Sequence, residues 1–191
     1  MSLNRKFYER DTAEVAKDLL GKNIIHREDS QVFKGKIVET EAYFGPEDPA
    51  SRAKDEKTKI NENMWKKGGT TLVYMVHSYW LFNIATEGND IPGAVLIRAV
   101  EPLEGIEFMK LRREREREKE LASGPGTFTQ AFGITKDHHG IDVTSSDTLS
   151  VEQGERDVEP SEIKYSHRIG VTEDLERELR FFIGDNGHVS R

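Results

Sequence analysis

Residues 35–48 read GKIVETEAYFGPED, and this stretch decides the fold of the chain. Ile37 and Val38 near its start are β-branched, and Gly45-Pro46 interrupts the run near its end, a pattern that predicts a strand followed by a turn. Side chains alternate between the faces of a strand, so Glu39, Glu41 and Tyr43 share one face, while the opposite face suits a core. Acidic residues on a strand face are most often solvent-exposed; a site in which the carboxylates do chemistry is the alternative.

The length and composition are those of an ordinary soluble protein. The 191 residues, 35% of them hydrophobic and 33% charged, suit one domain, 1–191, with a sizeable core. No apolar run approaches the roughly 20 residues of a membrane span, and the first residues do not resemble a signal peptide. The absence of cysteine excludes disulfides, thiolate metal sites and a thiol nucleophile. We therefore expect an intracellular protein, in the cytoplasm or nucleoid of a prokaryote or the nucleus of a eukaryote.

The net charge is −7 and the isoelectric point is near 5.5. This balance argues mildly against a nucleic-acid-binding protein, because phosphates are neutralised by Lys and Arg. A local basic face stays open, because residues 45–69 form a long polar segment of the kind that is usually a functional loop or disordered. Its basic positions after Arg52 are Lys54, Lys57, Lys59, Lys66 and Lys67.

Periodicity and turn residues predict an α+β protein with several antiparallel strands and a few helices. The expected helices are 10–20, 102–121 and 127–132, and the expected strands are 23–26, 32–43, 70–76, 94–100, 149–152, 168–171 and 179–183. The aromatic run 77–84 is most simply a buried segment, with Trp80 and Phe82 in the core.

Arg98 lies inside the apolar strand expected at 94–100. A buried arginine needs partners, so it forms either a structural ion pair or part of a site. From residue type alone, the structural ion pair is the more common outcome.

Several familiar catalytic motifs are absent. The chain has no G-x-G-x-x-G, P-loop or G-x-S-x-G pattern, and residues 123–126 (SGPG) follow a predicted helix instead of forming a nucleophile elbow. The adjacent His138 and His139 lack the H-E-x-x-H spacing, so we expect no metal site. A carboxylate strand, a basic loop, aromatic residues and a buried arginine remain. Together they suit hydrolysis of a glycosidic bond beside a flat ring.

The sequence resembles the alkyladenine (3-methyladenine) DNA glycosylases of the mammalian type, also called methylpurine-DNA glycosylases. The runs VETEAYFGPED and VLIRAVEPLEG are specific, and the matching segments occur in the family's order over most of residues 35–190. These segments are 38–48, 61–65, 70–74, 82–84, 95–105, 123–126, 168–171 and 180–182.

The resemblance implies a fold and a function. The fold is a single compact domain with a curved antiparallel sheet, surrounding helices and a protruding β-hairpin that enters the minor groove. The function is that of a monofunctional base-excision-repair enzyme, which flips alkylated or deaminated purines out of duplex DNA and hydrolyses their N-glycosidic bond. No metal or other cofactor, no membrane and no second subunit are implied.

The resemblance also implies residue roles. Glu41 is the general base that deprotonates the attacking water, and Arg98 lies beside that water. Tyr43 stacks on the flipped base, and Tyr74 lines its other side. Asn83 lies in the pocket and helps to exclude guanine by crowding its exocyclic amine.

The sequence departs from the family at positions that contact DNA or substrate. Arg52, which we keep among the substrate-binding residues, stands where the family has histidine, and Thr127 stands where it has lysine. His77 takes the place of the tyrosine that intercalates into the gap left by the flipped base, with Tyr79 as the alternative. These departures motivate a second hypothesis, a catalytically weak lesion-binding protein of the same fold. A third, a metal-dependent hydrolase using His77, His138 and His139, has less support.

Overall fold

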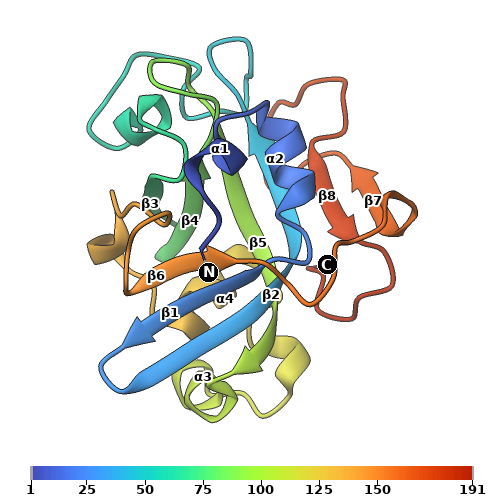
Figure 1. The fold of residues 1–191 in the computed structure, drawn as a ribbon. Coiled ribbons are helices and arrows are strands. Elements are labelled where there is room, and N and C mark those ends of the chain that lie inside the picture. Colours follow the sequence, from blue (N-terminus) through green and yellow to red (C-terminus); the bar gives the residue numbers. More distant parts are fainter. Residues whose placement is uncertain (1, 191) are drawn as a thin grey trace.

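The computed structural model describes residues 2–190, which form a curved antiparallel sheet with helices packed around it (Figure 1). The strands of these residues are β1 (Asn23–Glu28), β2 (Gln31–Tyr43), β3 (Thr71–Val76), β4 (Tyr79–Ala85), β5 (Ala94–Glu104), β6 (Leu149–Glu152), β7 (Ile163–Ser166) and β8 (Arg180–Ile183). The main path of the sheet is β3-β4-β5-β2-β1-β6, and β8 pairs with both β2 and β7.

Strand β2 organises this sheet. Its first half pairs with β1, its second half pairs with β8, and β5 lies along its other side. The β2–β5 pairing shifts register on both sides of Glu39, which pairs with Ala99, while Thr40 pairs with Ile97. Arg98, between those two partners, has no Cα partner on β2. Such a shift re-aims side chains, and it sets Arg98 beside the carboxylates of β2.

Helices cover both faces of the sheet around β5. They are α1 (Arg5–Tyr8), α2 (Thr12–Asp18), α3 (Ile106–Arg113) and α4 (Pro125–Phe132), with 3₁₀ turns at Glu62–Trp65, Glu118–Glu120, Lys136–His138 and Pro160–Glu162. Helix α2 packs on β2 and β5, and α4 packs on β4 and β5. Among the described residues 2–190, no helix has the length and apolar character to cross a membrane.

Local chemistry explains why α2 begins and packs where it does. The Asp11 carboxylate accepts the backbone N–H groups of Ala13 and Glu14, an N-cap that satisfies two donors of the first turn. The hydroxyl of Thr40 on β2 donates to the Ala16 carbonyl at 2.8 Å, so this face of β2 is covered by the helix. The acidic face of β2 therefore points away from α2.

Two sequence-based assignments of secondary structure were wrong. The helix expected over 102–121 is shorter, because β5 continues to Glu104 before Gly105, at φ 80°, turns the chain into α3. Glu114, at φ 51°, then ends α3 at Arg113. The strand expected at 168–171 lies earlier, at β7. The backbone N–H of Ile169 binds a side chain instead of a neighbouring strand.

Smaller differences concern element ends and burial. Helix α4 begins at Pro125, two residues before the expected start, because a proline is well tolerated at the first helical position. Of the two aromatic residues expected in the core, Phe82 is fully buried, whereas Trp80 is only partly buried. Strands β3 and β4 form a hairpin whose two-residue turn, His77 and Ser78, has φ values of 47° and 68°. Positive φ at both positions is what tight hairpin turns require.

A pair of histidines joins β1 to the turn after α4. Nδ1 of His26 lies 2.7 Å from the Phe132 carbonyl, which can only accept, so this nitrogen carries the proton. Nδ1 of His138 accepts the Thr135 backbone N–H, which leaves its Nε2–H to donate to Nε2 of His26 at 2.9 Å. This arrangement requires both rings to be neutral, and burial lowers the pKa of each.

We expect the histidine pair to make stability depend on pH. Because the folded pKa values lie below the unfolded value of about 6.5, the unfolded chain binds more protons as the pH falls below that value, and stability is lost. Urea unfolding near pH 7.5 and near pH 5.5 should therefore show a lower free energy of unfolding at the lower pH. The His138→Ala variant should lose less between the two conditions, whereas His77→Ala, altered at an exposed turn, should match the wild type. An equal loss in all three proteins would contradict this assignment.

Candidate active site

Glu39 and Glu41 are fully buried, which excludes the solvent-exposed alternative for this face of β2. Two segments that are distant in sequence cover this face. The loop 167–179 contributes the Ile169 N–H, which donates to Glu41, and the segment 184–190 contributes Ser190, which donates to Glu39. Buried carboxylates need such partners, because an unpaired buried charge is very costly.

Three donors surround the Glu41 carboxylate. The Tyr43 hydroxyl donates to Oε2 at 2.7 Å, the Ile169 N–H donates to Oε1 at 2.8 Å, and Nη1 of Arg98 lies 3.3 Å from Oε1. Burial raises the pKa of Glu41, and these three donors offset only part of that rise. Burial and the nearby Glu41 raise the pKa of Tyr43 well above its ordinary value, so its hydroxyl remains a donor.

Arg98 joins the two glutamates. Its Nε lies 2.8 Å from Oε1 of Glu39, while Nη1 reaches Glu41. Arg98 also lines the cleft described below. Arg98 therefore forms the structural ion pair that its residue type suggested, and it does so at the lining of the cleft. The guanidinium is held by one carboxylate and presented to the other at the cleft.

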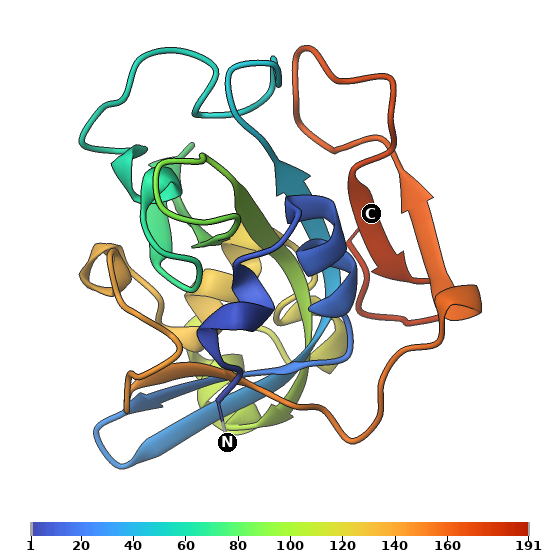
Figure 2. The same ribbon diagram turned by 45° about the horizontal axis from the view of Figure 1, so that its top comes forward.

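A cleft of about 1090 Å³ opens over this cluster. Residues from the predicted site that line it are Tyr43, Arg52, Tyr74, His77 and Arg98. Glu41 and Asn83 are buried behind the lining: Glu41 contacts Tyr43 and Arg98, and the Asn83 amide donates to the Leu72 carbonyl at 3.1 Å. The loops 44–61 and 167–179 stand at the same end of the molecule, where β2 finishes (Figure 2).

Two tyrosines flank the cleft. Tyr43 ends β2 and Tyr74 lies on β3, with β4 and β5 between them, and Leu81 and Leu96 from those central strands also line the cleft. The Arg52 guanidinium lies 4.9 Å from the centre of the Tyr74 ring, a cation–π contact. Burial raises the pKa of Tyr74, although Arg52 opposes the rise. The apolar floor and aromatic sides suit a flat, planar ligand.

The hairpin tip favours His77 over Tyr79 as the protruding side chain. His77 is exposed at the turn, whereas Tyr79 is 50% exposed and packs on Gly126 at the start of α4. A Cβ at Gly126 would lie 2.7 Å from three atoms of Tyr79, so glycine is required for this contact. Tyr79 is therefore anchored to the helix.

Sequence reasoning missed Arg168, whose side chain is fully buried. Its two Nη atoms each lie 2.7 Å from an Asp48 oxygen, and Nη2 lies 2.6 Å from Asp174. The guanidinium carbon is 4.6 Å from the centre of the Tyr43 ring, so Arg168 supports this tyrosine. The only signal in the sequence was the family run 168–171, which carried no residue role.

The histidines considered for a metal site have other partners. His138 contacts His26, and His139 contacts Asn63 and the backbone of Val73. No group of three or more His, Cys, Asp or Glu within residues 2–190 is arranged to hold a metal ion. The hypothesis of a metal-dependent hydrolase gains no support from these positions.

The sequence model described as "Methylpurine-DNA glycosylase (MPG)" matches residues 6–187. The chain belongs to the methylpurine-DNA glycosylase family. This membership confirms the family expected from the sequence, the α+β fold with its curved antiparallel sheet, and DNA glycosylase as the class of enzyme.

Relatives match the chain over its whole length. A Clostridium perfringens protein is 42% identical over 206 residues, which cover 100% of both chains. A Chlorobium phaeobacteroides protein is 40% identical over 189 residues, or 98% of this chain and 95% of the relative. A Carboxydothermus hydrogenoformans protein is 39% identical over 192 residues, covering 100% of both chains. Each carries the name "Putative 3-methyladenine DNA glycosylase".

We expect Arg168→Ala to destabilise the protein by about 3–5 kcal/mol, because it leaves the carboxylates of Asp48 and Asp174 without their cation. Arg156 makes a comparable two-pronged contact with Glu162 at the surface, with its side chain 65% exposed. Arg156→Ala should therefore have a much smaller effect. Urea unfolding of both variants measures the difference, and equal losses would show that burial of the Arg168 network contributes little.

Proposed function

We propose that the protein is a monofunctional DNA glycosylase that hydrolyses the N-glycosidic bond of alkylated or deaminated purines, of the 3-methyladenine type, in duplex DNA. The observation that carries the proposal is the buried Glu41 carboxylate, held beside Arg98 directly behind the lining of a cleft with tyrosines on two sides. In this proposal residues 1–191 act as one domain and as a monomer. Neither a metal nor another cofactor takes part.

The damaged nucleotide flips out of the duplex and its base enters the cleft between Tyr43 and Tyr74. Unstacking costs a few kcal/mol and is cheapest where damage has weakened the base pair. The base stacks on Tyr43, whose position is supported by Arg168 from behind. An alkylated purine is cationic, and stacking on an electron-rich ring favours a cation.

Glu41 and Arg98 lie beside the attacking water in the next step. The water oxygen forms a bond to C1′ of the sugar while the bond from C1′ to the base nitrogen breaks, and the electron pair of that bond goes to the base. Glu41 takes a proton from the attacking water. A cationic purine departs as a neutral molecule, so it needs little help from an acid.

Three residues in or directly behind the cleft lining act on selectivity and DNA contact. Asn83 crowds the exocyclic amine of guanine, and Arg52 offers only donors at the Tyr74 wall. His77 intercalates into the gap left by the flipped base, a role supported by its exposed place at the hairpin tip and by the anchoring of Tyr79.

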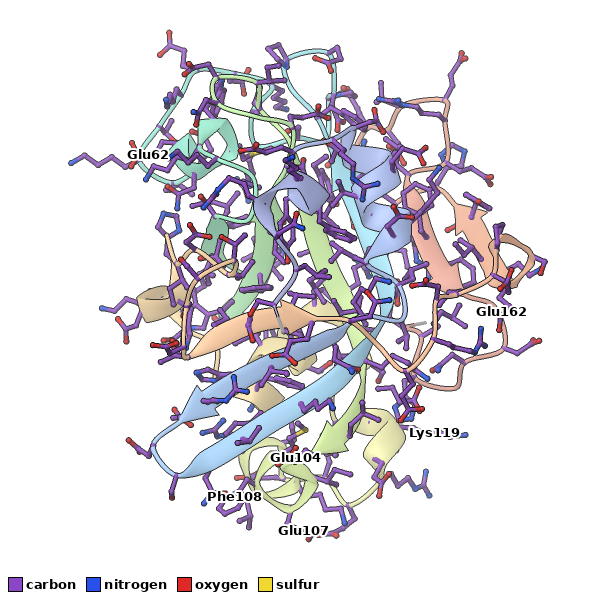
Figure 3. All side chains as sticks on the ribbon, viewed as in Figure 1. Glu62, Glu104, Glu107, Phe108, Lys119 and Glu162 are labelled. Carbon is purple, nitrogen blue, oxygen red and sulfur yellow. The ribbon has the colours of Figure 1, made fainter. Side chains whose placement is uncertain are left out.

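The charges around the cleft are mixed: Arg52 and Lys54 line it, and so do Asp55, Glu56 and Glu173. Glu104 and Glu107 lie at the end of the molecule opposite the loops around the cleft, whereas Glu62 lies on the 45–69 segment itself (Figure 3). That segment also carries Arg52 and lysines that face phosphates in this proposal, Lys54 and Lys57 among them.

The Glu41→Gln variant tests the mechanism. We expect the rate of 3-methyladenine release from alkylated duplex DNA to fall at least about 10²-fold, because an amide cannot accept the proton of water. Binding to lesion-containing duplex should persist. Glu104→Gln, altered on an exposed carboxylate at the far end of β5, serves as the control and should retain the wild-type rate. Full activity of the Glu41 variant would refute the mechanism.

The pH dependence of the excision rate should reflect the ionisation of the Glu41 carboxyl. Its raised pKa means that the active carboxylate is lost as the pH falls through a value above the ordinary range for glutamate. The single-turnover rate should therefore decline on the acid side with the loss of one ionised group. Charged or polar groups facing Glu41 are Arg98, Glu39, Tyr43, Tyr74 and the Ile169 N–H. Arg98→Met should move the acid limb to still higher pH, and an unchanged limb would count against the pairing.

A second candidate is a lesion-binding protein that releases bases poorly. The observation that favours it is the hydrogen bond from the Tyr43 hydroxyl to Oε2 of Glu41. This bond occupies one carboxylate oxygen of the residue proposed as the general base. Tight binding to duplexes carrying 3-methyladenine, hypoxanthine or ethenoadenine without release would support it. Ready release of any of these bases by the wild-type protein would exclude it.

A further inference from the structure

Glu39 is a fully buried carboxylate that accepts four hydrogen bonds. Its Oε1 accepts from Nε of Arg98 at 2.8 Å, from Nε of Arg180 at 2.7 Å and from the Ser190 hydroxyl at 2.8 Å. Its Oε2 accepts the Ser190 backbone N–H at 2.6 Å. Ser190 therefore supplies two of the donors, including the one recorded for Oε2.

Contacts along the segment 184–190 hold Ser190 beside Glu39. After β8 the chain turns back, so that its C-terminal end lies beside β8 in both views (Figures 1 and 2). The Asn186 amide donates to Glu101 on β5 at 2.7 Å, and Nη2 of Arg180 donates to the Ser190 carbonyl at 3.1 Å. Only 8% of Ser190 is exposed. These contacts make the segment a fixed part of the structure around Glu39.

We propose that Ser190 is a positioning residue for base excision: it fixes the carboxylate of Glu39, which aims Arg98 at Glu41. This inference rests on the proposed function, in which Glu41 activates water. Ser190 is not itself a lining residue of the cleft; its hydroxyl contacts Glu39 and Arg98, and it acts through these two residues.

The geometry shows why Arg98 would respond. Its contact with Glu39 is short, at 2.8 Å, while Nη1 is 3.3 Å from Glu41 and Nη2 is 3.4 Å from the Ser190 hydroxyl. Without that hydroxyl, Glu39 has one donor fewer, and a buried carboxylate compensates by drawing the remaining cations closer. The contact that lengthens is the one between Nη1 of Arg98 and Glu41, which is already 3.3 Å long. Glu41 then loses the cation that favours its ionised form.

The test compares Ser190→Ala, Ser190→Thr and Ser150→Ala in the full chain. Ser150 is a matched control, because it is 2% exposed and its hydroxyl has no hydrogen-bond partner among residues 2–190. The measurements are single-turnover release of 3-methyladenine from a duplex across about pH 5–8, the Kd for that duplex, and unfolding in urea.

We expect Ser190→Ala to reduce the single-turnover rate near neutral pH by about tenfold and to move the acid limb to higher pH, with the Kd unchanged. Ser190→Thr keeps the hydroxyl and should restore both the rate and the limb. Ser150→Ala should match the wild type.

A Ser190→Ala protein with the wild-type rate and acid limb would overturn the inference. So would a reduced rate that follows loss of folded protein in urea, with the acid limb unmoved. These results differ from a failure of the proposed function, in which the wild-type protein releases no base from any of the duplexes at any pH.

Discussion

Glu39, Arg98 and Glu41 form a buried ion cluster where β2 meets β5. Two carboxylates without solvent contact are tolerated only when cations and hydrogen-bond donors surround them. That requirement explains the neighbours of β2. Strand β5 brings Arg98 and strand β8 brings Arg180. The loop 167–179 and the segment 184–190 close the cluster with backbone N–H groups.

The local part of this arrangement could be predicted from the sequence. Strand alternation placed Glu39 and Glu41 on one face, and both now meet the same guanidinium. Arg98, within an apolar strand, indicated that a buried cation would need acidic or hydrogen-bonding partners. The family resemblance then supplied roles for residues that lie in the lining of one cleft or directly behind it.

The parts that could not be predicted depend on contacts distant in sequence. Arg168 was assigned to a strand, but its ion pair with Asp48, 120 positions away, fixes it in a loop. The burial of Glu39 depends on Ser190, 151 positions away. The long charged run after Arg113 has strong helical character, yet Glu114 adopts a left-handed conformation and ends the helix. Neither periodicity nor propensity contains such information.

The distance in sequence between Glu39 and Ser190 has a consequence for synthesis on the ribosome. A nascent chain that has emerged only as far as β5 already contains the glutamates and Arg98, but neither Arg180 nor Ser190. Loop closure over this span must precede the last contacts of the cluster. The ion cluster is therefore completed only when nearly all of the described chain has left the ribosome, after most strands of the sheet have already emerged.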